Sequence, residues 1–381
     1  MKIAMVTPYD LAVPSGVNTH AQYLADAFRN WGHEVQVIGP ASQALPRTST
    51  SPRVLGRARP VRAGGSVARI ALSYRLGHSV RTLLRREAFD IVHLHEPLMP
   101  TLPLQFLRHS HAVNIATFHA AEPIGRRLGQ IAAPLLARWL NRLDARIAVS
   151  AVAGAQAEHY LGRPCEVIPN CINVAAFARA APLPADPPQG LHENRRTILF
   201  VGRQEPRKGL AHLLTAYGRL RAQRPDAQLV IVGPLSPLGR RQRNRVQRQG
   251  WKDVIFTGAV SQTDLLHYYQ TADLLCAPAT GGESFGLILV EAMAAGLPIV
   301  ASAIPGYRDL LGRSEAGVMV PPQDPTSLAE ALITLLDDQS ARTAMGAAGR
   351  RRAETFRVET VGQQVLALYD HHLNRQGRAA G

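Results

Sequence analysis

Residues 273–302 have the sequence DLLCAPATGGESFGLILVEAMAAGLPIVAS, in which two short apolar runs enclose a glycine-rich loop and a longer apolar segment. The outer runs, 273–278 and 298–302, are continuously apolar, as is typical of strands that are buried on both faces of a parallel sheet. The segment between them has the composition of a helix, and we expect that helix to start near Ser284. A strand, a helix and a second strand form a βαβ unit, so the stretch predicts a parallel α/β sheet.

The same alternation of apolar runs and helical patterns covers most of the chain and predicts two doubly wound α/β domains. We place these domains at residues 1–170 and 171–356, and we interpret the proline-rich stretch 180–196 as the connection between the halves. Ligands of such sheets bind at the carboxyl ends of the strands, which predicts a central cleft. The other predicted strands are at residues 2–8, 34–39, 90–95, 114–119, 146–150, 166–169, 197–202, 228–233, 253–258 and 317–320.

The charge of the chain is strongly basic. The 381 residues include 43 Lys and Arg against 28 Asp and Glu, a formal net charge of +15. This balance favours an anionic partner, which could be nucleic acid, a phosphorylated substrate or an anionic membrane. No acidic residue lies between Val35 and Arg86, and a second arginine cluster runs from Arg240 to Arg248. Nucleic acid is the least favoured partner, because the sequence has no helix-turn-helix, zinc or RNA-binding signature.

The compartment is inferred from cysteines and from the apolar runs. Cys165, Cys171 and Cys276 show no paired spacing, which favours a reducing environment. The first residues contain Pro8 and Asp10 and do not resemble a secretion signal. No stretch has the roughly 18 uncharged apolar residues of a spanning helix. We therefore expect a cytoplasmic protein, soluble or peripheral to a membrane.

The loop after the predicted strand 273–278 is a candidate binding site for a diphosphate. Backbone N–H groups of Ser284, Phe285 and Gly286, together with the dipole of the following helix, would bind an anion. Glu283 stands at the start of this helix as an acceptor for hydroxyl groups. Glu291 lies within the apolar run, where solvation is unfavourable, so a buried partner or a ribose diol at the edge of the cleft is expected.

Three further loops follow strand ends. Arg203 and Lys208, after the strand 197–202, would flank a diphosphate and stabilise charge on a leaving group. Gly16 lets the backbone approach a ligand, and His119 follows NIATF, residues 114–118, at the same sheet edge. A metal site could be considered at His93, His95 and Glu96. However, the histidines alternate with apolar residues and a proline follows, which favours a strand that ends in a loop.

These residues resemble a known family. GGESFGLILVEAMAAG matches the Glu-x7-Glu signature of the family-four retaining glycosyltransferases, which have the GT-B fold. The stretches PYDLAVPSGVNTHAQYLADAFRNWGHEV, GSVARI, HLHEPLMP, ATFHA, RIAVS, VIPNCINVAAF and EPRKG extend the resemblance across nearly the whole chain. It implies two Rossmann-like domains that face a central cleft, with a C-terminal helix at 357–376 that crosses back onto the first domain.

The resemblance implies a role for each matching residue. It assigns the donor diphosphate to Gly16, Arg203 and Lys208 and to backbone N–H groups of Phe285 and Gly286. It assigns hydroxyls of the transferred sugar to Glu283 and the nucleotide ribose to Glu291. His119 would line the reaction centre. Tyr9, Asn18 and Arg69 would lie beside the acceptor. No tightly bound cofactor and no metal ion is implied.

Within the family, the resemblance is greatest to members that transfer mannose from GDP-mannose to phosphatidylinositol. The acceptor side departs from them at Ser15, Asn18, Leu98 and Ala120, so a soluble sugar or sugar phosphate stays open as the acceptor. We also predict that residues 69–86 form one helix with an apolar stripe from Leu72 to Leu84. Either its arginines dock on the anionic inner face of the cell membrane, or it is an ordinary amphipathic helix that packs on its own sheet and leaves its arginines solvated.

Overall fold

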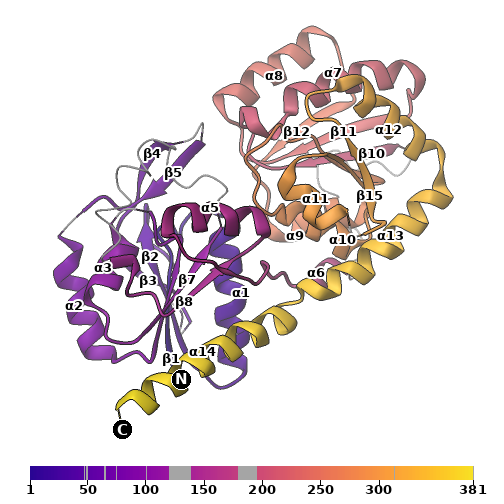
Figure 1. Cartoon of the computed structure of the whole chain (residues 1–381). Helices are drawn as coiled ribbons and strands as arrows, with labels where there is room; N and C mark the ends of the chain where they lie inside the picture. The colour runs from indigo at the N-terminus through magenta and orange to yellow at the C-terminus, as the bar shows by residue number, and fades with distance from the viewer. Residues whose placement is uncertain are drawn as a thin grey trace. The chain divides into compact units, whose positions relative to one another are not determined.

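The computed structural model describes residues 1–380 except 47, 49, 64–65, 74, 100, 120–138, 179–194 and 313, and no side chain is described at 62, 63, 66 and 376–380. The chain divides into two compact units (Figure 1). Unit 1 comprises Met1–Ile172 and Val358–Gly381, and unit 2 comprises Asn173–Arg357. The sequence placed these divisions after residues 170 and 356. Most of the connection expected at 180–196 lies outside the described residues.

Unit 1 contains a parallel sheet with the strand order β3-β2-β1-β6-β7-β8-β9. Helices α1 (Gly16–Asn30) and α14 (Val358–Ala380) cover one face, where α14 packs on α1 (Figure 1). Helices α2 (Leu76–Glu87), α3 (Leu102–His109) and α5 (Ala151–Leu161) contribute to the core on the other face. The strands are β1 Lys2–Val6, β2 Glu34–Ala41, β3 Arg53–Arg57, β6 Ile91–His95, β7 Val113–Phe118, β8 Ala145–Ala148 and β9 Glu166–Val167.

The helix predicted over residues 69–86 is wrong in its first part. Residues Arg59–Ala63 (β4) and Ser66–Ile70 (β5) form an antiparallel pair, and Ile70 also bridges to Tyr9. This pairing, with the bond from Asp10 N to Arg69 O, uses backbone groups that a helix would need. The helix therefore begins only at Leu76, and Leu72 is 47% exposed instead of lying in a buried stripe.

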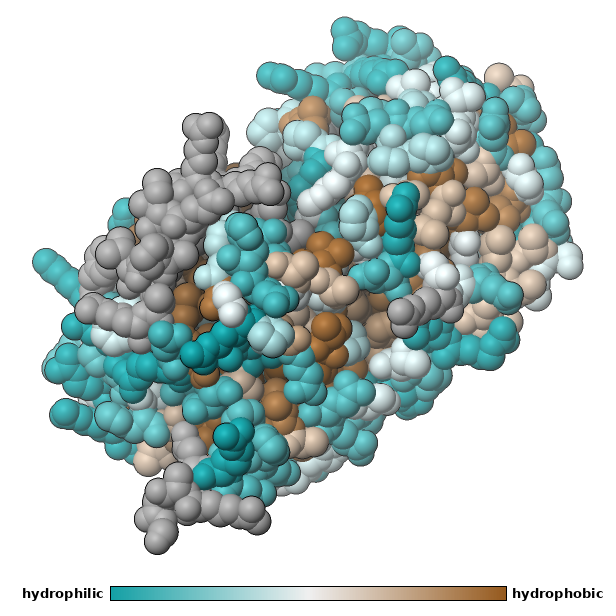
Figure 2. Space-filling model, viewed as in Figure 1, coloured by the Kyte–Doolittle hydropathy of each residue, from teal (hydrophilic) through white to brown (hydrophobic). Residues whose placement is uncertain are grey.

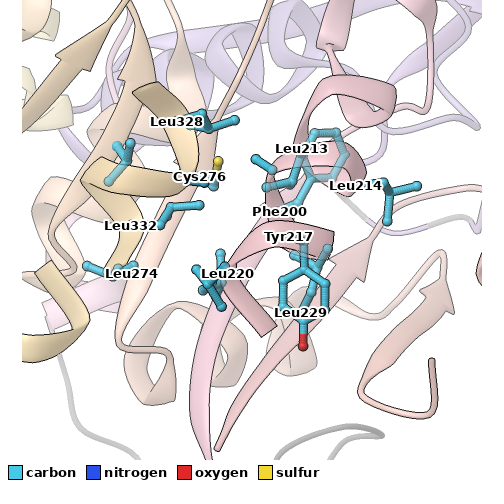
Figure 3. Packing of buried hydrophobic residues seen from close by; sticks show 14 of the residues in the cluster. Phe200, Leu213, Leu214, Tyr217, Leu220, Leu229, Leu274, Cys276, Leu328 and Leu332 are labelled. Atoms are coloured by element: carbon cyan, nitrogen blue, oxygen red, sulfur yellow. The ribbon is translucent and has the colours of Figure 1, made fainter. Parts of the chain in front are cut away.

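Unit 2 contains a second parallel sheet, with the strand order β12-β11-β10-β13-β14-β15. Its core on one face, shown in Figure 3, is formed with α7 (Leu210–Gln223), α8 (Pro237–Arg248) and α12 (Pro325–Asp337). Helices α9 (Gln262–Thr271), α10 (Leu287–Ala295) and α11 (Pro305–Leu311) contact the same sheet without joining this cluster. The strands are β10 Arg196–Val201, β11 Ala227–Val232, β12 Val254–Gly258, β13 Leu274–Ala277, β14 Ile299–Ser302 and β15 Gly317–Val320.

The remaining elements connect or extend the two units. Unit 2 begins with the short helix α6 (Val174–Ala178) and ends with α13 (Gln339–Ala353) and the 3-10 turn η2 (Glu354–Phe356). A second 3-10 turn, η1 (Pro206–Lys208), follows β10. Among the described residues, no helix combines the length and apolar composition that crossing a bilayer requires.

Each sheet has a point where the strand order reverses, and these points locate the candidate sites. In unit 1 the chain reverses between β1 and β6, and in unit 2 between β10 and β13. In doubly wound sheets, ligands bind outside the carboxyl ends of the strands at this switch point. The loops after β1, β6, β10 and β13 carry most of the residues that the sequence singled out.

Candidate functional site

The switch point of unit 2 brings together cations after β10 and a carboxylate after β13. Lys208 ends the turn η1, and its Nζ lies 2.7 Å from Oε1 of Glu283. Both side chains are largely buried, with 15% and 12% exposed. Arg203 is half exposed and pairs with Glu205 at 3.2 Å. The two predicted cations and Glu283 therefore occupy adjacent loops of one sheet edge.

Arg207 joins these groups into a chain of ion pairs. Its guanidinium contacts Oε2 of Glu205 at 3.0 Å and also pairs with Glu283. Its NH1 also donates to Gly282 O at 3.3 Å, and its carbonyl oxygen accepts a bond from Thr280 N. Arg207 thus fixes the loop after β13 to the loop after β10. Sequence analysis missed this residue, although it lies between the two predicted cations.

Two glycines allow the loop that carries Glu283 to take its form, Gly286 by its left-handed backbone and Gly306 of α11 by its lack of a side chain. Gly286 has φ of +94°, and a Cβ there would lie 2.7 Å from the ring of Tyr307. At Gly306, a Cβ would lie 2.1 Å from the carbonyl oxygen of Glu283. The left-handed conformation of Gly286 delays the helix, so α10 begins at Leu287 and not near Ser284. The buried ring of Phe285 packs edge-on against Phe356 and anchors the loop.

The start of α10 can bind an anion. Its N-cap Gly286 offers no side-chain hydrogen bond to the first turn. Among the hydrogen bonds that the described residues make, none is donated by the backbone N–H of Phe285 or Gly286. Such N–H groups and the helix dipole stabilise negative charge, and Lys208 lies beside the same loop through its pair with Glu283. The arrangement suits a diphosphate.

Glu291 is half-buried on α10 and has a specific partner. The hydroxyl of Tyr269 donates a hydrogen bond of 2.6 Å to its Oε2. Burial raises the pKa of the Glu291 carboxyl, while the bond from Tyr269 and the charge of Lys208 oppose this rise. Glu291 and Lys208 are therefore close enough to interact electrostatically. Tyr269 could not be identified from sequence, because its contact with Glu291 exists only in the folded chain.

The switch point of unit 1 collects a second set of residues. His119 follows β7, is 7% exposed, and donates its backbone N–H to Oε1 of Glu96 at 2.5 Å. Glu96 follows β6 and is 1% exposed. Burial, and then the charge of Glu96, raise the pKa of the Tyr9 hydroxyl well above its usual value. Tyr9, Glu96 and His119 thus lie together. Glu96 follows the end of a strand, as the sequence indicated, and its contact with His119 makes it a further candidate site residue.

The other predicted residues of unit 1 lie in or beside the loop that follows β1. Ser15 caps α1 by accepting a bond from Asn18 N, which places Gly16 in the first turn. The Asn18 side chain accepts a bond from Thr7 and donates to Asp10 O at 2.9 Å. Arg69 lies on β5, is half exposed, and contacts Asp10 at 4.0 Å. The side-chain amide of Asn18 therefore forms hydrogen bonds within the loop that follows β1.

Four buried histidines extend from this site into the core of unit 1. His95 Nδ1 lies 3.0 Å from His119 Nε2, His93 stacks on His95, and His20 lies edge-on to both His95 and His119. His93 is also hydrogen-bonded to Tyr369 of α14. Burial lowers the pKa of His20 and of His93 to about 3, and burial with neighbouring histidines lowers the pKa of His95 and of His119 well below the usual value. All four rings are therefore neutral near pH 7.

The rings of His20, His95 and His119 come close enough that a metal ion could be considered. One ring nitrogen from each lies within 4.8 Å of the others. However, Cys171 N donates to His20 Nδ1 at 3.1 Å, and an amide can only donate. The single lone pair of the neutral His20 ring is thereby used, and Nε2 carries the proton. A metal would have to break this bond, so the arrangement suits a hydrogen-bonded cluster better.

The arginines of α2 and α8 lie on separate units. Val80 and Leu83 of α2 are buried against the sheet, while Arg81, Arg85 and Arg86 are exposed. Arg86 pairs with Glu87, which also contacts Lys2. On α8 the exposed side chains are those of Arg240, Arg241, Arg243, Asn244, Gln247 and Arg248, and hydrophilic residues cover this helix in Figure 2.

The structure has two doubly wound units, and the second has cations, carboxylates and a helix N-terminus at its switch point. This is the architecture expected for a glycosyltransferase of the GT-B class. A family model described as Glycosyltransferase Family 4 matches residues 14–176, and one described as Glycosyl transferases group 1 matches residues 185–352. The chain belongs to glycosyltransferase family 4.

Curated relatives agree with this family, and a solved structure agrees with the fold. The chain is 36% identical over 376 residues to a phosphatidyl-myo-inositol mannosyltransferase of Mycolicibacterium smegmatis, covering 97% of this chain and 94% of that protein. The protein with the same name from Propionibacterium freudenreichii is 33% identical, with the same coverages. Sucrose-phosphate synthase from Thermosynechococcus elongatus superposes with a TM-score of 0.76 at 22% identity, covering 100% of both chains. This last likeness shows the fold alone.

Proposed function

We propose that the chain transfers a hexose from a nucleotide sugar to a membrane lipid, with retention of anomeric configuration. The proposed donor is GDP-mannose and the proposed acceptor is the head group of phosphatidylinositol. Curated relatives with 33% identity or more carry the name of this activity. The observation that supports the donor half most directly is the contact between Lys208 and Glu283 at the switch point of unit 2.

In the proposed donor site, each residue of unit 2 has one task. Arg203, Lys208 and the backbone N–H groups of Phe285 and Gly286 hold the diphosphate. Glu283 accepts hydrogen bonds from hydroxyls of the transferred sugar, and Glu291 accepts them from the ribose. The cations and the N–H groups stabilise the negative charge that grows on the departing diphosphate, which lowers the barrier to breaking the bond to the sugar.

The proposed chemistry is transfer on one face of the sugar. The bond from the anomeric carbon to the diphosphate oxygen breaks, and a bond to the acceptor oxygen forms on the same face. The acceptor proton passes to an oxygen of the departing diphosphate. His119 is neutral near pH 7 because burial lowers its pKa, so it serves as a hydrogen-bonding group and not as a cation. Tyr9 and Arg69 are proposed to contact the acceptor.

The acceptor has a second candidate, a soluble sugar or sugar phosphate. Two observations favour it. The side-chain amide of Asn18 is used within its own loop, and Leu98 is buried in the core cluster of unit 1. Both positions are among those where the chain departs from the lipid-modifying members of the family. Under this alternative, the donor residues keep their tasks and membrane docking is unnecessary.

A substrate panel tests the proposal. The full chain is incubated with radiolabelled GDP-mannose, UDP-glucose or ADP-glucose, each with total polar lipid, with purified phosphatidylinositol or with a set of free sugar phosphates. Transfer from GDP-mannose to phosphatidylinositol supports the proposal. Label in a soluble product selects the alternative acceptor, and transfer from UDP-glucose or ADP-glucose alone overturns the proposed donor.

A further inference from the structure

A buried tyrosine on α9 is directed at the carboxylate of Glu291. Tyr269 is 1% exposed, and its hydroxyl donates to Glu291 Oε2 at 2.6 Å. The two residues come from different helices, α9 and α10, so their contact depends on how the helices pack. A hydrogen bond to a carboxylate is among the stronger ones in proteins, and it fixes the plane of the carboxyl group.

The ring of Tyr269 is itself held in place from the start of unit 2. Phe177 of α6 packs edge-on against it, with ring centroids 5.5 Å apart. The neighbouring Gln270 donates from its side chain to the carbonyl oxygens of Phe177 and Ala176, at 3.2 and 3.3 Å. These contacts hold α9 against α6 at this position. Movement of the Tyr269 hydroxyl away from Glu291 would disturb the packing of both helices.

The charges of the pair determine which group donates. Burial and the nearby carboxylate raise the pKa of Tyr269 well above its usual value, so it keeps its proton throughout the physiological range. Burial raises the pKa of Glu291, and the same hydrogen bond, together with the charge of Lys208, offsets part of this rise. Tyr269 is thus a permanent donor to Oε2, and it stabilises the ionised form of Glu291.

We propose that Tyr269 is a positioning residue that makes the site selective for ribose. By occupying Oε2, it orients Oε1 of Glu291 toward the hydroxyls of the nucleotide ribose. The inference rests on the proposed function, in which Glu291 binds that ribose. A nucleotide that lacks one of the two ribose hydroxyls gains less from this orientation, which gives the inference a specific signature.

The experiment measures binding of GDP and 2′-deoxy-GDP to the full chain by titration calorimetry. For the unsubstituted protein, we expect the deoxy nucleotide to bind about tenfold more weakly, as for loss of a hydrogen bond to a charged group. In Tyr269→Phe, the affinity for GDP should fall about fivefold, while the affinity for 2′-deoxy-GDP, which keeps one ribose hydroxyl, should fall only about twofold. Discrimination between the two nucleotides should therefore become smaller.

Tyr217→Phe is the matched control. Tyr217 is a fully buried tyrosine of α7 whose hydroxyl donates to the carboxylate of Asp253 at 2.5 Å. Its substitution removes the same type of bond elsewhere in unit 2, and it should leave ribose discrimination unchanged. Equal weakening of both nucleotides in Tyr269→Phe would show a structural role only and would overturn the inference.

The pH dependence gives a second readout. Removing the hydroxyl of Tyr269 should raise the pKa of Glu291, so the affinity for GDP in Tyr269→Phe should begin to fall at a higher pH on acidification than in the unsubstituted protein. An unchanged acid limb contradicts the inference. If the unsubstituted chain binds GDP without ribose discrimination, only the assignment of Glu291 and Tyr269 fails. If it binds none of GDP, UDP and ADP, the proposed function fails as well.

Discussion

Lys208 Nζ lies 2.7 Å from Glu283 Oε1, so a cation that follows β10 and a carboxylate that follows β13 form one ion pair at the switch point of unit 2. These strands are neighbours in the sheet although about 70 residues separate them in the chain. The pair presents a positive and a negative group side by side. A diphosphate and a sugar that carries hydroxyls have the complementary arrangement.

The first prediction concerns this pair. Glu283→Ala and Lys208→Ala should each lower kcat/KM by about 100-fold or more, because each removes a group that binds or stabilises the donor. Thermal unfolding should change little, since both side chains lie in loops and not in the apolar core. Lys252→Ala, at an exposed lysine of unit 2, is the control. Near-normal turnover in either site variant contradicts the assignment.

The second prediction concerns Arg207, which bridges Glu205 and Glu283. In Arg207→Met, Lys208 is the one cation of the described residues that still pairs with Glu283, so Lys208 is less available to the diphosphate. We expect KM for the donor to rise about tenfold with a smaller change in kcat. Arg221→Met is a matched control, because Arg221 also pairs with a carboxylate, Asp253, in unit 2. If both variants behave alike, Arg207 has no specific role.

The sequence predicted the sheets and the donor loops for a physical reason. Strands buried on both faces appear as continuous apolar runs, and the carboxyl ends of parallel strands meet at one edge. The sequence did not predict the strands β3, β4 and β5 in residues 53–70, because arginines interrupt the alternation of apolar and polar residues there. Partnerships such as Tyr269 with Glu291 depend on helix packing, and no sequence spacing encodes them.

The third prediction is stereochemical. NMR coupling at the anomeric carbon of the product should show the same configuration as the donor, and an inverted product would exclude the proposed mechanism.

A substitution at Glu96 tests for a covalent intermediate, because Glu96 is a carboxylate beside His119. Glu96→Gln keeps an oxygen that can accept the bond from His119 N. It should therefore retain substantial activity, whereas a loss of about 1,000-fold or more would indicate a nucleophile.

The fourth prediction is the response of unit 1 to acid. His20 and His93 stay neutral when folded because burial lowers the pKa of each to about 3, but they bind protons below about pH 6.5 when unfolded. The unfolded state then holds more protons, so stability falls as the pH drops from about 6.5 toward 3. Each histidine contributes up to about 1.4 kcal/mol per pH unit.

Hydrogen exchange of β1, β6 and β7, corrected for the intrinsic exchange rate, measures this response between pH 7.5 and 5.0. His93→Gln should reduce the slope of stability against pH, because one titrating ring is removed. The comparison uses the slope and not the absolute stability, since the substitution also disturbs the bonds of His93 to Tyr369 and Thr117. A slope that stays unchanged in this variant would contradict the prediction.

The last prediction is electrostatic docking of unit 1 on a membrane. Helix α2 buries its apolar residues in its own sheet, so its exposed Arg81, Arg85 and Arg86 can act only through charge. Basic residues near an anionic surface contribute about 1 kcal/mol each, and salt weakens them. Replacing all three by glutamine should lower binding to anionic liposomes about 100-fold and reduce transfer to embedded acceptor more than donor affinity.

The matched control for the membrane prediction replaces Arg240, Arg241 and Arg248 of α8 by glutamine, which removes the same charge from unit 2. Equal losses in both triple variants would indicate net charge without a defined surface, and binding to neutral vesicles or indifference to salt would favour the soluble acceptor.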